Sequence, residues 1–277
     1  MKTKKFQTNL LHIILILGFA FIAIIFHAFL PEDANLKNTN GLLIERFGFK
    51  AVAIFYFCIL YTHCSICVKT FGNKSSLAPK EIGLRFGLGF GLLYFFGILE
   101  VVSHPANPET WNYGDFLIFQ SLVGIGDALP AFFMCFLTAS FFINKQTIRH
   151  EKVKFQKQNF LVVLIIATAF TIERFVCYKF NLIINDYEIL PFPCMLWTFL
   201  FGIVIGCVYF LLLPIYHCNN TCMVKNLKLV ALTIGINWII FNSFIGLTHT
   251  NLMFDAILRS SIDIFVLFVT TTIIDES

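Results

Sequence analysis

Residues 193–215 read PCMLWTFLFGIVIGCVYFLLLPI, a run of 23 residues without a charged side chain. An α-helix of about 20 apolar residues crosses the hydrocarbon core of a bilayer, so this run predicts a transmembrane helix. The rest of the chain has the same character, because its 277 residues are 58% hydrophobic, 13% charged and include 35 Phe. Water-soluble domains carry about 25% charged residues. The composition therefore predicts an integral membrane protein.

Seven further apolar runs of similar length occur along the chain. Lipid offers no partner for backbone N–H and C=O groups, so each run is predicted to be helical. The first run follows three lysines, but no small-residue cleavage site comes after it, which favours a retained anchor over a signal peptide. We predict an all-α polytopic membrane protein. Its single membrane domain, residues 1–277, holds about eight transmembrane helices, at 9–30, 51–69, 83–103, 115–143, 159–178, 193–215, 228–247 and 252–274.

Basic residues gather in alternate connections between these helices, including the long link at 144–158. If the N-terminus is cytoplasmic, cytoplasmic segments hold 14 of the 20 basic residues and four of the 16 acidic ones. Cytoplasmic loops of membrane proteins carry an excess of Lys and Arg. We therefore predict that both termini are cytoplasmic (N-in/C-in), by default in a bacterial cytoplasmic membrane, with an endomembrane as the alternative. The net charge of +4 then reflects orientation in the lipid bilayer, and no nucleic-acid partner is expected.

The last predicted helix carries a stripe of ionisable side chains. Asp255, Arg259 and Asp263 follow one another at spacings of four residues, which places them on one helix face with Thr270. An ionisable group at membrane depth costs about 2.5–3.5 kcal/mol on insertion scales, so it is a functional candidate. The alternative is an internally paired stripe that holds the helix to its neighbours. In both cases we expect Arg259 to pair with at least one of the two carboxylates and to face the bundle.

The fourth predicted helix carries a second polar stripe. Pro130 closely follows Asp127, and a proline inside a helix frees a carbonyl and tends to kink the helix. The combination predicts a hinge or a binding point, with a purely structural motif as an equal alternative. The stripe consists of Gln120, Gly124, Asp127, Ala131 and Thr138.

The predicted topology brings further polar groups to one half of the membrane. The third, fifth and seventh helices run outward, and the eighth starts from the outer side, so their polar residues meet near the outer surface. We predict an acidic, water-accessible cavity that is open to the outside. The alternative is that the outer helix ends are simply polar. The predicted substrate- or ion-binding residues are Asp127, Gln120, Glu100, Glu173, Arg174, Asn242, Asp255, Arg259 and Asp263.

Metal-ligand patterns are weak in this chain, and no cofactor is predicted. Glu100 and His104 have a spacing from which one helix can present two ligands, and His249 could join them across the bundle. Histidines near helix ends are more often interfacial residues, and Cys is common in apolar surroundings. The short cysteine pairs that could bind zinc are Cys64 with Cys67 and Cys218 with Cys222.

Two local patterns concern packing. Gly83, Gly87 and Gly91 recur at spacings of four, which lets a neighbouring helix backbone approach closely. Residues 41–49 are expected to form either a short helix at the membrane interface or an irregular loop.

Three classes of function remain open. The chain contains no H-E-x-x-H, G-x-S-x-G or G-x-x-x-x-G-K-[ST] motif, so its sequence does not decide whether it is an enzyme. The favoured hypothesis is a small secondary transporter or permease that binds a cation, a proton or a cationic solute in the acidic cavity. One alternative is a non-catalytic accessory or immunity-type membrane partner. The other is an intramembrane enzyme that acts on a lipid-linked substrate at the outer leaflet. No oligomeric state is predicted.

Overall fold

The computed structural model describes residues 2–31, 39–104, 112–143, 157–216 and 221–276. All regular elements within these ranges are helical, which confirms the predicted all-α class. Eight helices are long and apolar enough to cross a membrane. Their bounds agree with the predicted spans to within a few residues, apart from the start of the seventh. They are Leu10–Ala28, Phe49–Gly72, Pro79–Ser103, Tyr113–Phe142, Asn159–Lys179, Pro191–Tyr216, Cys222–Thr248 and Thr250–Glu276.

The spans are built from long α-helices joined in places to short 3-10 or π segments. The longer helices are α1 (Lys2–Ala28), α3 (Phe49–Gly72), α4 (Pro79–Ile98), α5 (Tyr113–Phe142), α6 (Lys157–Lys179), α7 (Pro191–Leu212), α9 (Ile236–Thr248) and α10 (Met253–Glu276). The shorter ones are α2 (Leu42–Phe47), η2 (Leu99–Ser103), η3 (Leu213–Tyr216), α8 (Cys222–Asn226), η4 (Leu227–Gly235) and η5 (Thr250–Leu252).

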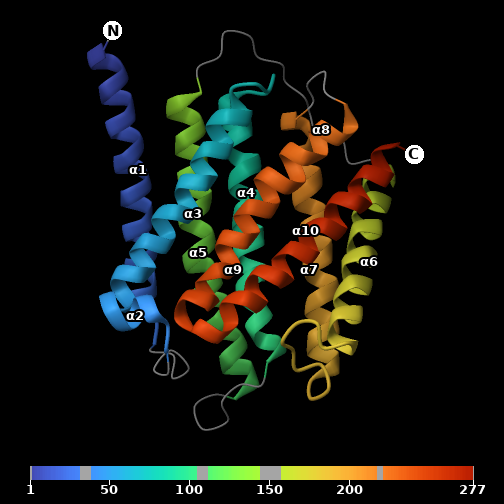
Figure 1. The fold of residues 1–277 in the computed structure, drawn as a ribbon. Helices are drawn as coiled ribbons and strands as arrows, with labels where there is room; N and C mark the ends of the chain where they lie inside the picture. Colours follow the sequence, from blue (N-terminus) through green and yellow to red (C-terminus); the bar gives the residue numbers. More distant parts are fainter. Residues whose placement is uncertain (1, 32–38, 105–111, 144–156, 217–220, 277) are drawn as a thin grey trace.

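Both chain ends lie at the same end of the helix bundle (Figure 1). α1 lies at the edge of the bundle, whereas α4 runs through its middle (Figure 1). α10 crosses the bundle at a slant and packs against α6 and α9 (Figure 1). Since the third and fifth spans run away from the terminal end and α10 runs back toward it, η2 and the last turns of α6 come close to the first half of α10.

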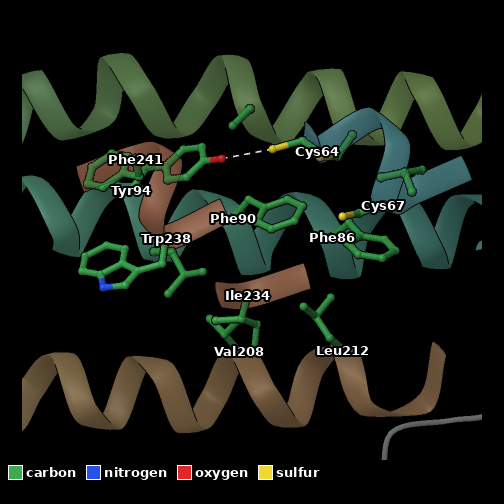
Figure 2. Close-up of a cluster of buried hydrophobic side chains, with 14 of the residues drawn as sticks. Cys64, Cys67, Phe86, Phe90, Tyr94, Val208, Leu212, Ile234, Trp238 and Phe241 are labelled. Carbon is green, nitrogen blue, oxygen red and sulfur yellow. Dashed lines mark hydrogen bonds between the residues drawn. The ribbon is translucent and has the colours of Figure 1, made fainter. Parts of the chain in front are cut away.

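The contact between α4 and α5 depends on the predicted glycine stripe. A Cβ atom at Gly83 would lie 2.8 Å from the Cα of Phe136, and one at Gly87 would lie 2.8 Å from the carbonyl oxygen of Phe132. These distances leave no room for a side chain, so the predicted close packing is confirmed. An adjacent face of α4 is aromatic, and Figure 2 shows Phe86, Phe90 and Tyr94 along the core, where successive rings stack.

The seventh span is not a uniform α-helix. It begins at Cys222, earlier than predicted, and passes through the π-helix η4 before α9. Inside η4 the hydroxyl of Thr233 donates a hydrogen bond to the carbonyl oxygen of Lys228, 2.9 Å away. The ring Nε2 of His63, on α3, lies 3.1 Å from the carbonyl oxygen of Leu232. Side chains therefore bond to backbone carbonyls along this wider turn.

Residues 41–49 adopt the helical one of the two expected forms. α2 covers Leu42–Phe47, and Gly48 follows it with a φ of 80°, which turns the chain into α3. Glycine adopts this left-handed region without strain. Leu42 and Phe47 are exposed, as expected for a short helix beside lipid.

Candidate functional site: a buried ion-pair network

Arg174 on α6 lies at the centre of a group of charged side chains and is fully buried. Its Nε donates to Oδ1 of Asp263 at 2.8 Å, and its Nη2 donates to Oδ2 of the same residue at 2.7 Å. Its Nη1 donates to Oε1 of Glu100 at 3.0 Å. Its guanidinium carbon also lies 5.3 Å and 5.6 Å from the ring centres of Phe170 and Trp197. The guanidinium is thus held by two carboxylates and two aromatic faces.

Arg259 on α10 extends this group toward the surface. Its Nη1 donates to the same Oε1 of Glu100 at 2.6 Å, so Glu100 bridges the two arginines. Its Nη2 donates to Oδ2 of Asp255 at 2.7 Å and to the carbonyl oxygen of Ile184 at 2.8 Å. The expectation that Arg259 pairs with a neighbouring carboxylate and turns inward is met through Asp255. Asp263 pairs with Arg174 instead, because α10 packs on α6 at that level.

Glu173 is the member with the fewest partners. Its Oε1 accepts a hydrogen bond from the thiol of Cys177 at 3.2 Å. Its Oε2 is buried without a hydrogen-bond partner and lies 3.9 Å from Nε of Arg174. Asp263 and Arg174 are its charged neighbours. The set of six residues, called the ion-pair network below, is Glu100, Glu173, Arg174, Asp255, Arg259 and Asp263.

Charge is unbalanced within the ion-pair network. It contains four carboxylates and two guanidinium groups. When all six groups are ionised, two negative charges have no counter-charge within the set. An unpaired charge is costly at membrane depth, so a proton or cation would stabilise this arrangement if it were bound there.

Sequence reasoning missed two contributors to the ion-pair network. The indole Nε1 of Trp238 donates to Oδ2 of Asp263 at 2.9 Å, and the backbone N–H of Ile184 donates to Oδ1 of Asp255 at 2.7 Å. Trp238 could have been predicted as a contributor, because a buried indole N–H needs a hydrogen-bond acceptor. Ile184 lies in the segment between α6 and α7 and contributes only backbone atoms, which no residue type reveals.

An open hollow of about 420 Å³ lies beside Asp255 at the end of the bundle that is opposite the termini. Its walls come from the segment after α6 and from the start of α10. The lining includes Asn181, Leu182, Asn185, Asn251, Asp255 and Leu258.

Three predicted binding residues lie apart from the ion-pair network. Asp127 on α5 faces α1, where its Oδ1 lies 2.8 Å from Nε2 of His27. Asn242 donates to the hydroxyl of Ser260 at 2.9 Å, and Gln120 is buried on α5. Within the described ranges, no hydrogen bond joins these three residues to the ion-pair network. Asp127 and Gln120 are separated from the ion-pair network because α5, which carries them, packs mainly on α1, α3 and α4.

The weak metal candidates are dispersed. His104 lies 2.6 Å from Oδ2 of Asp186 through its Nδ1, and His249 bonds to the hydroxyl of Thr248 at 2.9 Å. Figure 2 shows Cys64 bonded to the hydroxyl of Tyr94, at 3.0 Å, with Cys67 beside Phe86. Both thiols are buried in this apolar cluster. Cys222 is half-buried, while Cys218 lies outside the described residues. Where the structure describes the chain, no three His, Cys, Asp or Glu side chains gather to hold a metal ion.

Comparisons of the chain with protein-family models, with curated proteins and with solved structures find no match. A fold can host many activities, so function has to be argued from the site. Here the site is the ion-pair network and the hollow beside it.

Proposed function

We propose that this multi-pass membrane protein is a small secondary transporter that couples to a proton or a small cation. The observation that carries the proposal is the excess of carboxylates in the ion-pair network, with Oε2 of Glu173 buried and without a hydrogen-bond partner. Ionisable residues inside membrane proteins commonly mark ion pathways and proton relays. A proton or monovalent cation between Glu173 and Asp263 would supply one of the two missing positive charges.

Binding at this point has a direct consequence for helix packing. A cation next to Asp263 competes with Arg174, whose two hydrogen bonds join α6 to α10. Arg174 keeps Glu100 as a second partner, so it can release Asp263 without being left unpaired. Exchange of partners within such a cluster gives two discrete packings of α10, which is what coupled transport needs.

The charge distribution of the loops supports an orientation for this transporter. With both termini in the cytoplasm, the ion-pair network and the hollow fall in the outer half of a cell membrane, in the simplest case a bacterial cytoplasmic membrane. The ligand then meets Asp255 before it meets Glu173.

The two alternatives differ from this proposal in what they require of the carboxylates. An enzyme needs an acid or base that is free to touch its substrate, yet Oε1 of Glu100 already accepts hydrogen bonds from both Arg174 and Arg259. An accessory protein needs only stable ion pairs. A buried carboxylate oxygen without a hydrogen-bond partner adds no stability to the fold. The unpartnered Oε2 of Glu173 therefore favours the transporter over the accessory protein.

The test uses everted membrane vesicles that are energised to accumulate protons and stained with acridine orange. Na+, K+ or phenethylammonium is added, and proton release is followed as recovery of the dye fluorescence. We expect at least one of these cations to release protons from wild-type vesicles but not from Glu173→Gln vesicles. Glu188→Gln is the matched control, because the same chemical change is made at an exposed residue outside the network.

Two results would contradict the proposal. One is that none of the three cations releases more protons from wild-type vesicles than from vesicles without the protein. The other is that Glu173→Gln, at equal amounts of folded protein, behaves like the wild type.

A further inference from the structure

The hollow at the start of α10 has a mixed lining. Three Asn side chains and one carboxylate stand beside apolar side chains such as Leu182 and Leu258. Asp255 alone is charged among the described residues that line it, and none is basic. The hollow is open to its surroundings and has a volume of about 420 Å³.

Asp255 connects the hollow to the interior of the bundle. It shares Arg259 with Glu100, and Glu100 in turn bonds to Arg174. A continuous chain of ion pairs therefore leads from the wall of the hollow to the fully buried Arg174. At the surface end of these ion pairs, the backbone N–H of Ile184 donates to Asp255 and its carbonyl oxygen accepts from Arg259.

We propose that the hollow binds an organic ammonium cation, with a charged head next to Asp255 and an apolar body against Leu182 and Leu258. The ammonium group donates hydrogen bonds, and the acceptors here are the Asp255 carboxylate and the side-chain amide oxygen of Asn251. The amide oxygens of Asn181 and Asn185 already accept hydrogen bonds from Asn185 and Tyr187. An anion is disfavoured at the same place. Both Nη atoms of Arg259 already donate, to Glu100, Asp255 and Ile184, and its Nε, which has no partner, is buried, so an anion in the hollow would face Asp255 and not a cation.

This inference rests on the proposed function only for the onward step from the hollow to Glu173. A cation at Asp255 competes with Nη2 of Arg259 for the carboxylate and so loosens the contact of α10 with Ile184. Binding to the hollow itself requires neither a membrane gradient nor transport, so it can be tested separately.

The test measures binding to the purified full-length chain in lipid nanodiscs by isothermal titration calorimetry. Phenethylammonium is the probe, and phenylacetate is its matched control, since it carries a similar ring and the opposite charge. Asn251→Trp and Leu182→Trp each fill the hollow from one wall. Ile189→Trp places the same indole on the segment between α6 and α7, at an exposed position outside the hollow.

We expect saturable binding of phenethylammonium and none of phenylacetate. Either filling variant should raise the dissociation constant at least about tenfold, whereas Ile189→Trp should leave it unchanged. Two filling variants are used so that one can replace the other if it does not yield monodisperse protein. Absence of saturable phenethylammonium binding, equal binding of phenylacetate, or unchanged affinity in a folded filling variant would each overturn the site.

The vesicle assay separates this result from that of the proposed function. One outcome is that phenethylammonium binds and the filling variants lose this binding, but no cation releases protons. That outcome would support the ammonium site and contradict the proposed transport. Proton release driven only by Na+ or K+, without phenethylammonium binding, upholds the transporter and removes the ammonium site.

Discussion

Arg174 and Asp263, 89 residues apart in the chain, join α6 to α10 through two parallel hydrogen bonds of 2.8 Å and 2.7 Å. Both side chains are buried, and Trp238 donates a third hydrogen bond to the same carboxylate. Removing one partner of such a pair leaves an uncompensated charge inside the bundle. Stability and function are therefore both expected to be sensitive at this point.

Arg174→Ala should lower the free energy of unfolding by about 3–5 kcal/mol, the usual cost of breaking a buried ion pair. Arg174→Ala combined with Asp263→Ala should recover part of that loss, because Glu100 still has Arg259 as a partner. The measurement is unfolding by sodium dodecyl sulfate in mild detergent, followed by tryptophan fluorescence. Arg174→Ala with Glu188→Ala is the control pair and should be close to additive, since Glu188 is exposed and lies outside the ion-pair network. If the losses of stability in Arg174→Ala and Asp263→Ala simply added in the double variant, the ion pair between the two residues would be contradicted.

Gly87→Ala should be far more harmful than Gly89→Ala, although both add one methyl group to α4. At Gly87 the new Cβ would lie 2.8 Å from a backbone oxygen of α5, so the helices must move apart, at a cost of about 1–3 kcal/mol. At Gly89 the nearest atom is a side-chain carbon of Val208, 3.4 Å away, which is an ordinary contact. Folded yield by size-exclusion chromatography of a fluorescent fusion is the measurement. Equal yields of the two variants would show that the spacing of α4 and α5 is not limiting.

The loops at 144–158 and 216–227 are predicted to face the cytoplasm because they carry much of the Lys and Arg excess. A membrane-impermeant maleimide should therefore modify Cys222 in everted vesicles and spare it in intact cells. Cys222→Ser identifies its share of the signal among the nine cysteines. The same test applies to Cys218. Rapid modification in intact cells, at the rate of a periplasmic control thiol, would reverse the topology.

His27 and Asp127 should show an energetic coupling of about 0.5–3 kcal/mol in a double-mutant cycle of alanine variants. Their side chains lie 2.8 Å apart and join the peripheral α1 to α5. His27 also stacks on Phe57 of α3, with 5.9 Å between the ring centres, so the single variant His27→Ala loses more than the ion pair. The double-mutant cycle cancels this loss of stacking, because it occurs both with and without Asp127. Strict additivity would mean that packing alone holds α1.

Much of the fold could be predicted because the rule that governs it is local. A run of about 20 apolar residues must be helical in lipid, so eight spans follow from the sequence without any knowledge of their arrangement. The spacing of Gly83, Gly87 and Gly91 likewise indicates a close contact, although not that α5 would supply it. The positions of Glu100, Arg174 and Asp255 near one end of the bundle follow from the direction of each helix.

The partners within the site could not be predicted in the same way. Spacing along α10 shows that Arg259 can reach Asp255 or Asp263, but only the packing of α10 on α6 assigns Asp263 to Arg174. The sequence predicts Asp127 at the bottom of the same cavity, below the other polar groups, yet its side chain faces α1. Depth is a one-dimensional property that follows from sequence, whereas the lateral order of helices depends on the whole set of contacts.

The π-helix at Leu227–Gly235 makes this part of the seventh span tolerant of a change in chain length. A π turn closes a hydrogen bond to the fifth residue instead of the fourth, so it holds one residue more than an α turn. Deleting one residue there would let that turn close as an α turn, and the residues after it would keep the faces that they present. The same deletion at the start of α9 would rotate Trp238 by about 100° and turn its indole away from Asp263. A single-codon deletion is thus predicted to be tolerated within the π stretch and to disconnect α9 from α10 when it falls between Gly235 and Trp238.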